Sequence, residues 1–152
     1  MIKGTKRTHR GFTLIEVLFA IFLVVICALV VAATMPIANT SRAKASDLDK
    51  AMGLAQKQIE AIRGLGYPNV TATQLASNGL IDSTNPVTAN TFSFSNSDSA
   101  NLDNPSLVLT NGSGTVKVEQ VNMDLRRVTV QVTWRDRVQY KTFSVGTLIA
   151  NL

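Results

Sequence analysis

The residue types that most often carry chemistry are sparse in this chain. Its 152 residues include one histidine, His9, and one cysteine, Cys27. A single cysteine cannot form an intrachain disulfide. A single histidine within a basic N-terminal leader leaves serine and cysteine nucleophiles without their usual base. The carboxylates form no recognisable catalytic pair on one predicted element, so we expect no enzymatic activity.

A cluster of oxygen-bearing side chains is the best candidate for a metal site. It consists of Asn96, Asp98, Asn101, Asp103 and Asn104. Calcium prefers hard oxygen ligands of this kind, which makes Asp98 and Asp103 candidate ligands. The spacing lacks the glycine and the terminal glutamate of an EF-hand loop. The alternative is a solvated polar loop, and we predict that the chain binds no cofactor.

The distribution of charge along the chain does not favour nucleic-acid binding. The net charge is +5, but the first ten residues contain four of the 15 basic residues and no acidic one. A second basic group surrounds the predicted C-terminal hairpin and comprises Arg126, Arg127, Arg135, Arg137 and Lys141. Four of these residues have a spacing compatible with one common face: Arg127, Arg135, Arg137 and Lys141. Trp134 is expected on the opposite face and cannot stack on bases there. Because basic residues also keep exposed strands from pairing with other chains, nucleic acid is not an expected partner.

Glu16 lies beside a stretch of 22 residues, Val17 to Ala38, that contains no charged residue. Such a stretch is long enough to cross about 30 Å of hydrocarbon as a helix. It fits a secretory signal peptide, a single-span anchor, or a span in which Glu16 has a function. A charge inside a membrane is costly without a partner. Glu16 therefore either lies solvated at the headgroup level or pairs with a positive group.

The residues around Glu16 resemble the processing and methylation signature of type IV prepilins and pseudopilins. In that family a short basic leader ends in glycine, phenylalanine usually follows, and a glutamate is the fifth residue after the cut. The corresponding residues here are Gly11, Phe12 and Glu16, preceded by the leader's basic residues Lys6, Arg7 and Arg10. The resemblance covers residues 10–33 and does not extend to the C-terminal part of the chain.

The resemblance implies a role for each of these positions. A prepilin peptidase would cut after Gly11, where the missing side chain lets an enzyme approach the backbone, and would methylate the amine of Phe12. Glu16 would attract the N-terminal amine of a neighbouring subunit, which supplies the partner that its charge needs. The other implied partners are further pilin or pseudopilin subunits, bound through the N-terminal helix, and an inner-membrane assembly platform.

The resemblance also implies a location. The precursor would cross the bacterial inner membrane once, with the basic N-terminus in the cytoplasm, as the distribution of positive charge also favours. It would then join a periplasmic or extracellular filament.

The helix is predicted to continue beyond the membrane. Pro36 should kink it near the end of the span. Residues 39–65 are then expected to form an amphipathic helix that stops at Gly64 and Gly66. A sheet is expected to pack on its apolar stripe. The stripe consists of Leu48, Met52, Ala55, Ile59 and Ile62.

The C-terminal half divides into a polar connection and a set of strands. Residues 66–106 are predicted to be a Ser, Thr and Asn-rich loop with a short helix at 74–77 and a short strand at 91–95. Residues 107–152 are predicted to be an antiparallel meander, with strands at 107–110, 115–121, 126–134 and 138–145 and a turn at 111–114. Alternation along the third of these strands places Val128, Val130, Val132 and Trp134 on one face.

These predictions give an α+β fold. A long N-terminal helix, transmembrane in its first half, holds a small sheet of three or four antiparallel strands on its distal half, as in the pilin lollipop. The expected segments are a cleaved leader at 1–11, a span at 12–38, an amphipathic helix at 39–65, a loop at 66–106 and a β-meander at 107–152.

The function implied by the resemblance is structural. The chain would be a subunit of a type IV pilus-like or type II secretion pseudopilus filament. Because Cys27 stands alone, the disulfide common in subunits of the pilus shaft cannot form. Its absence favours a minor pilin, a pseudopilin or a lineage without the bridge, and of these we expect a minor pilin or pseudopilin. The alternative is a single-pass envelope binding protein that forms no filament.

Overall fold

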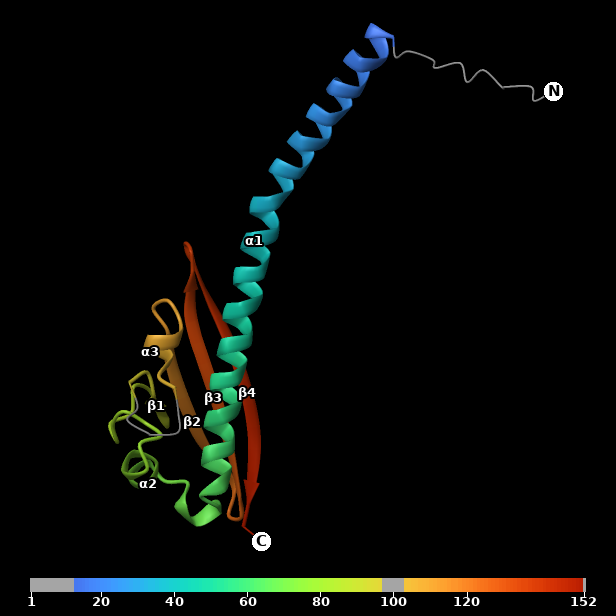
Figure 1. Ribbon diagram of the computed structural model, residues 1–152. Coiled ribbons are helices and arrows are strands. Elements are labelled where there is room, and N and C mark those ends of the chain that lie inside the picture. The colour runs from blue at the N-terminus through green and yellow to red at the C-terminus, as the bar shows by residue number, and fades with distance from the viewer. Residues whose placement is uncertain (1–12, 97–102, 152) are drawn as a thin grey trace, which may run out of the picture. The chain divides into compact units, whose positions relative to one another are not determined.

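The structure is a computed structural model that describes residues 13–96 and 103–151. It divides into two compact units, residues 1–42 and 43–152, which we describe separately. Figure 1 shows the order of the elements, beginning with the long helix α1, Leu14–Gly64. The predicted α+β architecture of a long N-terminal helix and a small antiparallel sheet is confirmed.

The first unit contains the apolar part of α1. Side chains from Thr13 to Asn39 are all exposed in the single chain, and the helix is long and apolar enough to cross a membrane. Pro36 lies inside the helix and does not end it. Proline removes one intrahelical hydrogen bond, and the kink expected at this residue stays a prediction.

In the second unit, α1 buries one face against a sheet. Its buried residues are Ala51, Leu54, Ala55, Gln58, Ile59 and Ile62. The predicted stripe was wrong at its start, because Leu48 is 41% exposed and Met52 is only partly buried. The buried face of α1 begins instead at Ala51 and continues through Ala55, both of which are fully buried.

The sheet has four antiparallel strands in the order β1-β2-β3-β4 (Figure 1). Their bounds are Thr91–Ser93 for β1, Ser113–Asn122 for β2, Leu125–Asp136 for β3 and Gln139–Ala150 for β4. The register pairs Val130 with Val116 on one side and with Val145 on the other. The last three strands form a meander joined by short turns, as expected.

The inner face of the sheet supplies a large part of the core. Val128, Val130 and Val132 are fully buried, and Trp134 is 3% exposed, which confirms the predicted alternation along β3. Burying a side chain of this size stabilises the fold by roughly 1.5–3 kcal/mol. Phe143 and Val145 of β4 face the same side but are only partly buried, so the β4 edge of the core is less covered than its centre.

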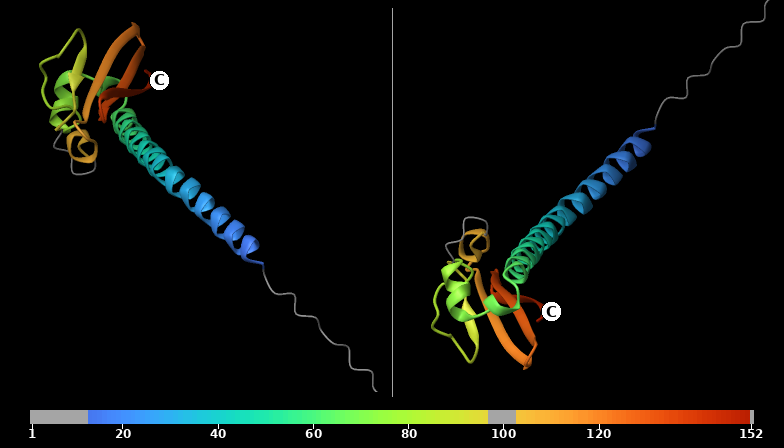
Figure 2. Two further views of the ribbon diagram at one scale, coloured as in Figure 1. Left: turned by 90° about the horizontal axis from the view of Figure 1, so that it is seen from above. Right: turned by 90° about the horizontal axis from the view of Figure 1, so that it is seen from below.

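The connection between α1 and β2 is more structured than a loop. It contains the 3₁₀ helix η1, Tyr67–Asn69, the helix α2, Ala72–Ser77, and strand β1, in agreement with the short helix and strand expected there. The Thr71 hydroxyl accepts a hydrogen bond from the Gln74 N–H and caps α2. Figure 2 shows these elements gathered beside the sheet at its β1 edge.

The strand predicted at 107–110 is wrong. Residues Pro105–Val108 form the short helix α3, because proline at the first helical position fits the backbone of a helix start. Leu107 is 82% exposed and therefore adds no core contact that would favour a strand. The Asn111–Gly112 turn leads from α3 into β2, so the outer partner of β2 is β1 and the sheet begins at residue 91.

Candidate processing and assembly segment

The described part of the candidate site begins at Thr13. The Thr13 carbonyl accepts hydrogen bonds from the N–H groups of Glu16, at 3.0 Å, and Val17, at 3.2 Å, which sets the first turn of α1. Glu16 is exposed and lies in that turn. A carboxylate in the first turn is favoured by the positive end of the helix dipole, so its position supports the helix and leaves its charge available.

The predicted processing residues lie just before this turn. Gly11, Phe12 and the leader's basic residues, Lys6, Arg7 and Arg10, are outside the described residues. Their roles in cleavage, methylation and peptidase binding stay predictions.

The surface that follows Glu16 is apolar on every side. Large side chains such as Leu18, Phe19 and Phe22 are 56%, 62% and 59% exposed, and Cys27 is exposed among them. Exposed apolar surface of this extent marks a membrane or protein interaction site. The segment requires lipid or other helices around it.

A comparison with protein families found one match at this segment. Residues 6–32 match the family described as the prokaryotic N-terminal methylation motif. The chain carries a type IV pilin-like prepilin motif. Searches of curated proteins and of solved structures gave no match.

The motif and the helix agree on two general points. The family of the prepilin motif is structural and not enzymatic. The apolar N-terminal helix and the prepilin motif also fit membrane anchoring of the chain as a precursor.

The candidate calcium residues are only partly described. Asp98 and Asn101 are outside the described residues. The Asp103 carboxylate forms an ion pair with Lys57 at 2.8 Å, and the Asn96 side-chain oxygen accepts a hydrogen bond from the Ser106 hydroxyl at 2.7 Å. Over residues 13–96 and 103–151, no three His, Cys, Asp or Glu side chains come together as a metal site would require, and calcium binding stays untested.

The predicted group of C-terminal basic residues does not share one face. Lys141 pairs with Trp134 in the register, which places it on the inner side, and its amine bonds Asp136 at 3.1 Å. Arg127 alternates with the buried valines of β3 and lies on the outer side. The strand register separates these residues, because the turn between β3 and β4 shifts the parity that the sequence displays.

Arg126 has a structural role that sequence reasoning missed. Its guanidinium lies 4.5 Å from the centre of the Tyr67 ring and donates hydrogen bonds to the carbonyls of Tyr67, at 3.0 Å, and Val70, at 2.7 Å. These contacts tie β3 to the segment after α1. The side chain is thus committed to the fold and is no part of an interaction surface.

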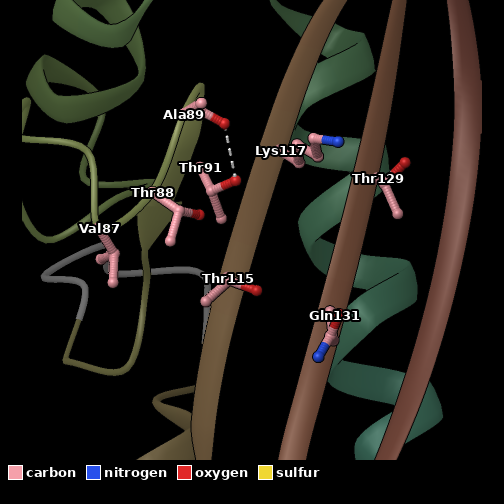
Figure 3. A pocket seen from close by; sticks show the side chains of 8 residues that line it. All are labelled: Val87, Thr88, Ala89, Thr91, Thr115, Lys117, Thr129 and Gln131. Atoms are coloured by element: carbon pink, nitrogen blue, oxygen red, sulfur yellow. Dashed lines mark hydrogen bonds between the residues drawn. The ribbon is translucent and has the colours of Figure 1, made fainter.

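The outer face of the sheet carries a hollow of about 540 Å³, shown in Figure 3. Its lining residues are Val87, Thr88, Ala89, Thr91, Thr115, Lys117, Thr129 and Gln131. Lys117 forms an ion pair with Glu119 at 2.6 Å, and the hydrogen bond and charge of Lys117 lower the pKa of Glu119. The other polar side chains are hydroxyls and an amide, so the hollow offers hydrogen bonds and no acid–base chemistry.

Proposed function

We propose that the chain is a structural subunit of a type IV pilus-like or type II secretion pseudopilus filament. The observation that carries the proposal is the fixed register of Gly11, Phe12 and Glu16 with an apolar helix that has no cover within its own chain. In this proposal the precursor crosses the bacterial inner membrane once, with a cytoplasmic N-terminus. The processed chain then enters a periplasmic or extracellular filament.

Processing prepares the N-terminus for assembly. A prepilin peptidase cuts after Gly11 and methylates the new amine of Phe12, which becomes the first residue of the mature chain. An α-amino group has a pKa of roughly 7.7–8.0, so the amine is largely positive near neutral pH. The cut therefore creates a cation four residues before the carboxylate of Glu16.

Glu16 then selects and aligns the neighbouring subunit. A carboxylate in a membrane-spanning helix costs up to roughly 3 kcal/mol on insertion scales where it lies deep, and less near the interface. Pairing with the Phe12 amine of an adjacent subunit offsets that cost as the helix leaves lipid for the filament. Apolar contact along α1 supplies the rest of the interface, and an inner-membrane assembly platform supplies the new subunits.

We further propose that the subunit is a minor pilin or pseudopilin. Cys27 is the only cysteine of the chain, so the outer domain is held together without the disulfide common in shaft subunits. Its core of Val128, Val130, Val132 and Trp134 serves in place of a covalent link.

A substitution of Glu16 tests the assembly role. Glu16→Val should leave membrane insertion intact or improve it, but should reduce the amount of chain in sheared filaments by about tenfold or more, since a loss of 1.4 kcal/mol already gives that factor. Glu60→Ala, a change at an exposed carboxylate elsewhere on α1, is the matched control. Normal incorporation of the Glu16 variant would contradict the role given to this residue. An uncleaved chain that inserts but never enters filaments would instead support the membrane-anchored binding protein.

A further inference from the structure

The turn between β3 and β4 has a composition that is poor for turn formation. Asp136 pairs with Gln139, so the loop consists of two residues, Arg137 and Val138. Such loops favour Asn-Gly or related pairs, because they need positive backbone angles. Arg137 has a φ of 57°, an angle that costs a residue with a side chain more than it costs glycine. A departure from local rules of this kind often marks a functional position.

The turn presents cations and apolar side chains to solvent. Val138 is 83% exposed and Tyr140 is 66% exposed. Arg135 and Arg137 are also exposed, and the Arg135 Nε donates to the Arg137 carbonyl at 3.0 Å, which holds the turn in shape. Within residues 13–96 and 103–151 neither arginine forms an ion pair with a carboxylate, whereas Lys141 is neutralised by Asp136.

The same end of the second unit contains the beginning of its helical segment. A hollow of about 350 Å³ is lined by Lys44, Ala45 and Leu48 of α1 and by Trp134, Lys141 and Thr142 of the sheet. Lys44 is therefore near the turn end of the β3–β4 hairpin. The opposite end of the sheet contains the β2–β3 turn, where the Tyr67 hydroxyl donates to the Met123 carbonyl (Figure 1).

Lys44 also follows closely after the apolar stretch along the chain. The charge-free stretch that begins at Val17 continues to Ser41, and Lys44 follows three residues later. Three residues span at most about 11 Å even when fully extended. That is comparable to the distance of about 8–10 Å over which charges act at physiological ionic strength.

We propose that the β3–β4 turn docks on anionic phospholipid headgroups while the chain is a membrane precursor. The inference rests on the membrane anchoring of the proposed function. Arg135, Arg137 and Lys44 meet the lipid phosphates, which arginine can bind with two parallel hydrogen bonds. Val138 enters the headgroup layer, and Tyr140 lies at the interface, where its ring is apolar and its hydroxyl is wet.

Docking would orient the outer domain before assembly. A subunit tethered at two points presents its sheet in one orientation, whereas a subunit tethered only by the span rotates freely. Extraction into a filament releases the turn from the lipid, and the arginines become available to neighbouring subunits.

The test uses the full chain with one fluorescent label at a time. Val138→Cys in a Cys27→Ser background receives an environment-sensitive dye, and the chain is reconstituted in phosphatidylcholine vesicles with and without phosphatidylglycerol. We expect a blue shift and quenching by headgroup-nitroxide lipid only when phosphatidylglycerol is present. Met123→Cys in the same background is the matched control, because Met123 is 88% exposed and lies in the β2–β3 turn. Its label should stay in water.

A second set of variants separates charge from folding. Arg137→Gly removes one cation but relieves the positive φ, so the fold should stay intact while docking weakens about fivefold, as expected for one basic residue at an anionic surface. Arg127→Gln removes the same charge from the outer face of β3 and should leave docking unchanged. Lys44→Gln should weaken docking as Arg137→Gly does.

Three results would overturn the proposal. The label at 138 could be as accessible to water as the label at 123, it could be equally shielded in neutral vesicles, or it could respond to a single-stranded oligonucleotide and not to lipid. A dye on the native Cys27 reports insertion of the span separately. If that dye were exposed to water the membrane anchoring would fail as well, whereas a buried Cys27 dye with an exposed 138 dye would contradict the docking alone.

Discussion

Two glycines of the fold differ in how much space surrounds them. A Cβ added at Gly112 would overlap the carbonyl oxygen of Pro105, while at Gly53 in α1 it would have no neighbour within 4 Å. Gly112 lies where the chain turns from α3 into β2. The close backbone approach there leaves no room for a side chain.

Alanine at these two glycines should therefore have opposite effects. Gly112→Ala should lower the free energy of unfolding by about 1–3 kcal/mol, as other overpacked sites do. Gly53→Ala should raise it by roughly 0.5–1 kcal/mol, because alanine loses less backbone entropy in a helix. Denaturant unfolding of the full chain in mild detergent, followed by the fluorescence of Trp134, measures both. A neutral Gly112 variant would contradict the packing at this turn.

The Glu119–Lys117 pair gives a prediction for pH. The hydrogen bond and charge of Lys117 lower the pKa of Glu119 below its ordinary 4.5. A carboxyl with a lowered folded-state pKa stabilises the fold above the unfolded pKa, and this contribution is lost as pH falls through the folded pKa. Glu119→Gln should therefore melt at a slightly lower temperature than the parent at pH 7, and this difference should disappear once the pH is well below the folded-state pKa of Glu119. A difference that persisted in acid would point to another cause.

At the scale of elements, the face of α1 that packs against the sheet can be tested directly. Ile59 is 7% exposed and Leu48 is 41% exposed. Ile59→Ala should cost about 2–5 kcal/mol of stability, as in other buried sites, whereas Leu48→Ala should cost well under half of that. The same fluorescence-monitored unfolding distinguishes them. Equal losses would mean that the helix packs on the sheet along the stripe first predicted, through Leu48 and Met52.

The sequence predicts a helix or a strand well where the segment follows a single hydrophobic pattern along its whole length. The alternation of β3 and the charge-free run of α1 are strong patterns, and both appear in the structure as expected. Residues 107–110 contain two leucines and a valine that look like a strand, but the preceding Pro105 starts a helix and the partner of β2 comes from residues 91–93. Strand pairing depends on contacts between distant segments, which local pattern does not contain.

The residues of the candidate site differ in how far the sequence alone predicts their placement. Gly11, Phe12 and Glu16 could be named from their resemblance to the prepilin signature, and their roles stay predictions. The division of Arg127 and Lys141 between two faces could not be, because it depends on the length of the β3–β4 turn. The commitment of Arg126 to Tyr67 and Val70 likewise depends on tertiary contact.

At the scale of the whole molecule, the chain combines a unit that has its own core with an apolar helical segment that is exposed. The outer unit has a continuous core from Ala51 to Ile149. The apolar half of α1 has no burial of its own and depends on its surroundings at every stage. In the proposed function, lipid in the membrane and neighbouring helices in the filament would cover the same apolar surface, so that one helix could serve both stages.

The central claim is that this chain is processed as a prepilin, and the intact mass of the chain recovered from membranes of a host with a prepilin peptidase tests it most directly. We expect a chain that begins at N-methylated Phe12, because residues 6–32 match the N-terminal methylation motif and the resemblance to prepilins implies a cut after Gly11. A chain that still begins at Met1, while a control prepilin in the same cells is cut, would contradict the claim. So would a chain that begins near Thr34, which would indicate cleavage by signal peptidase.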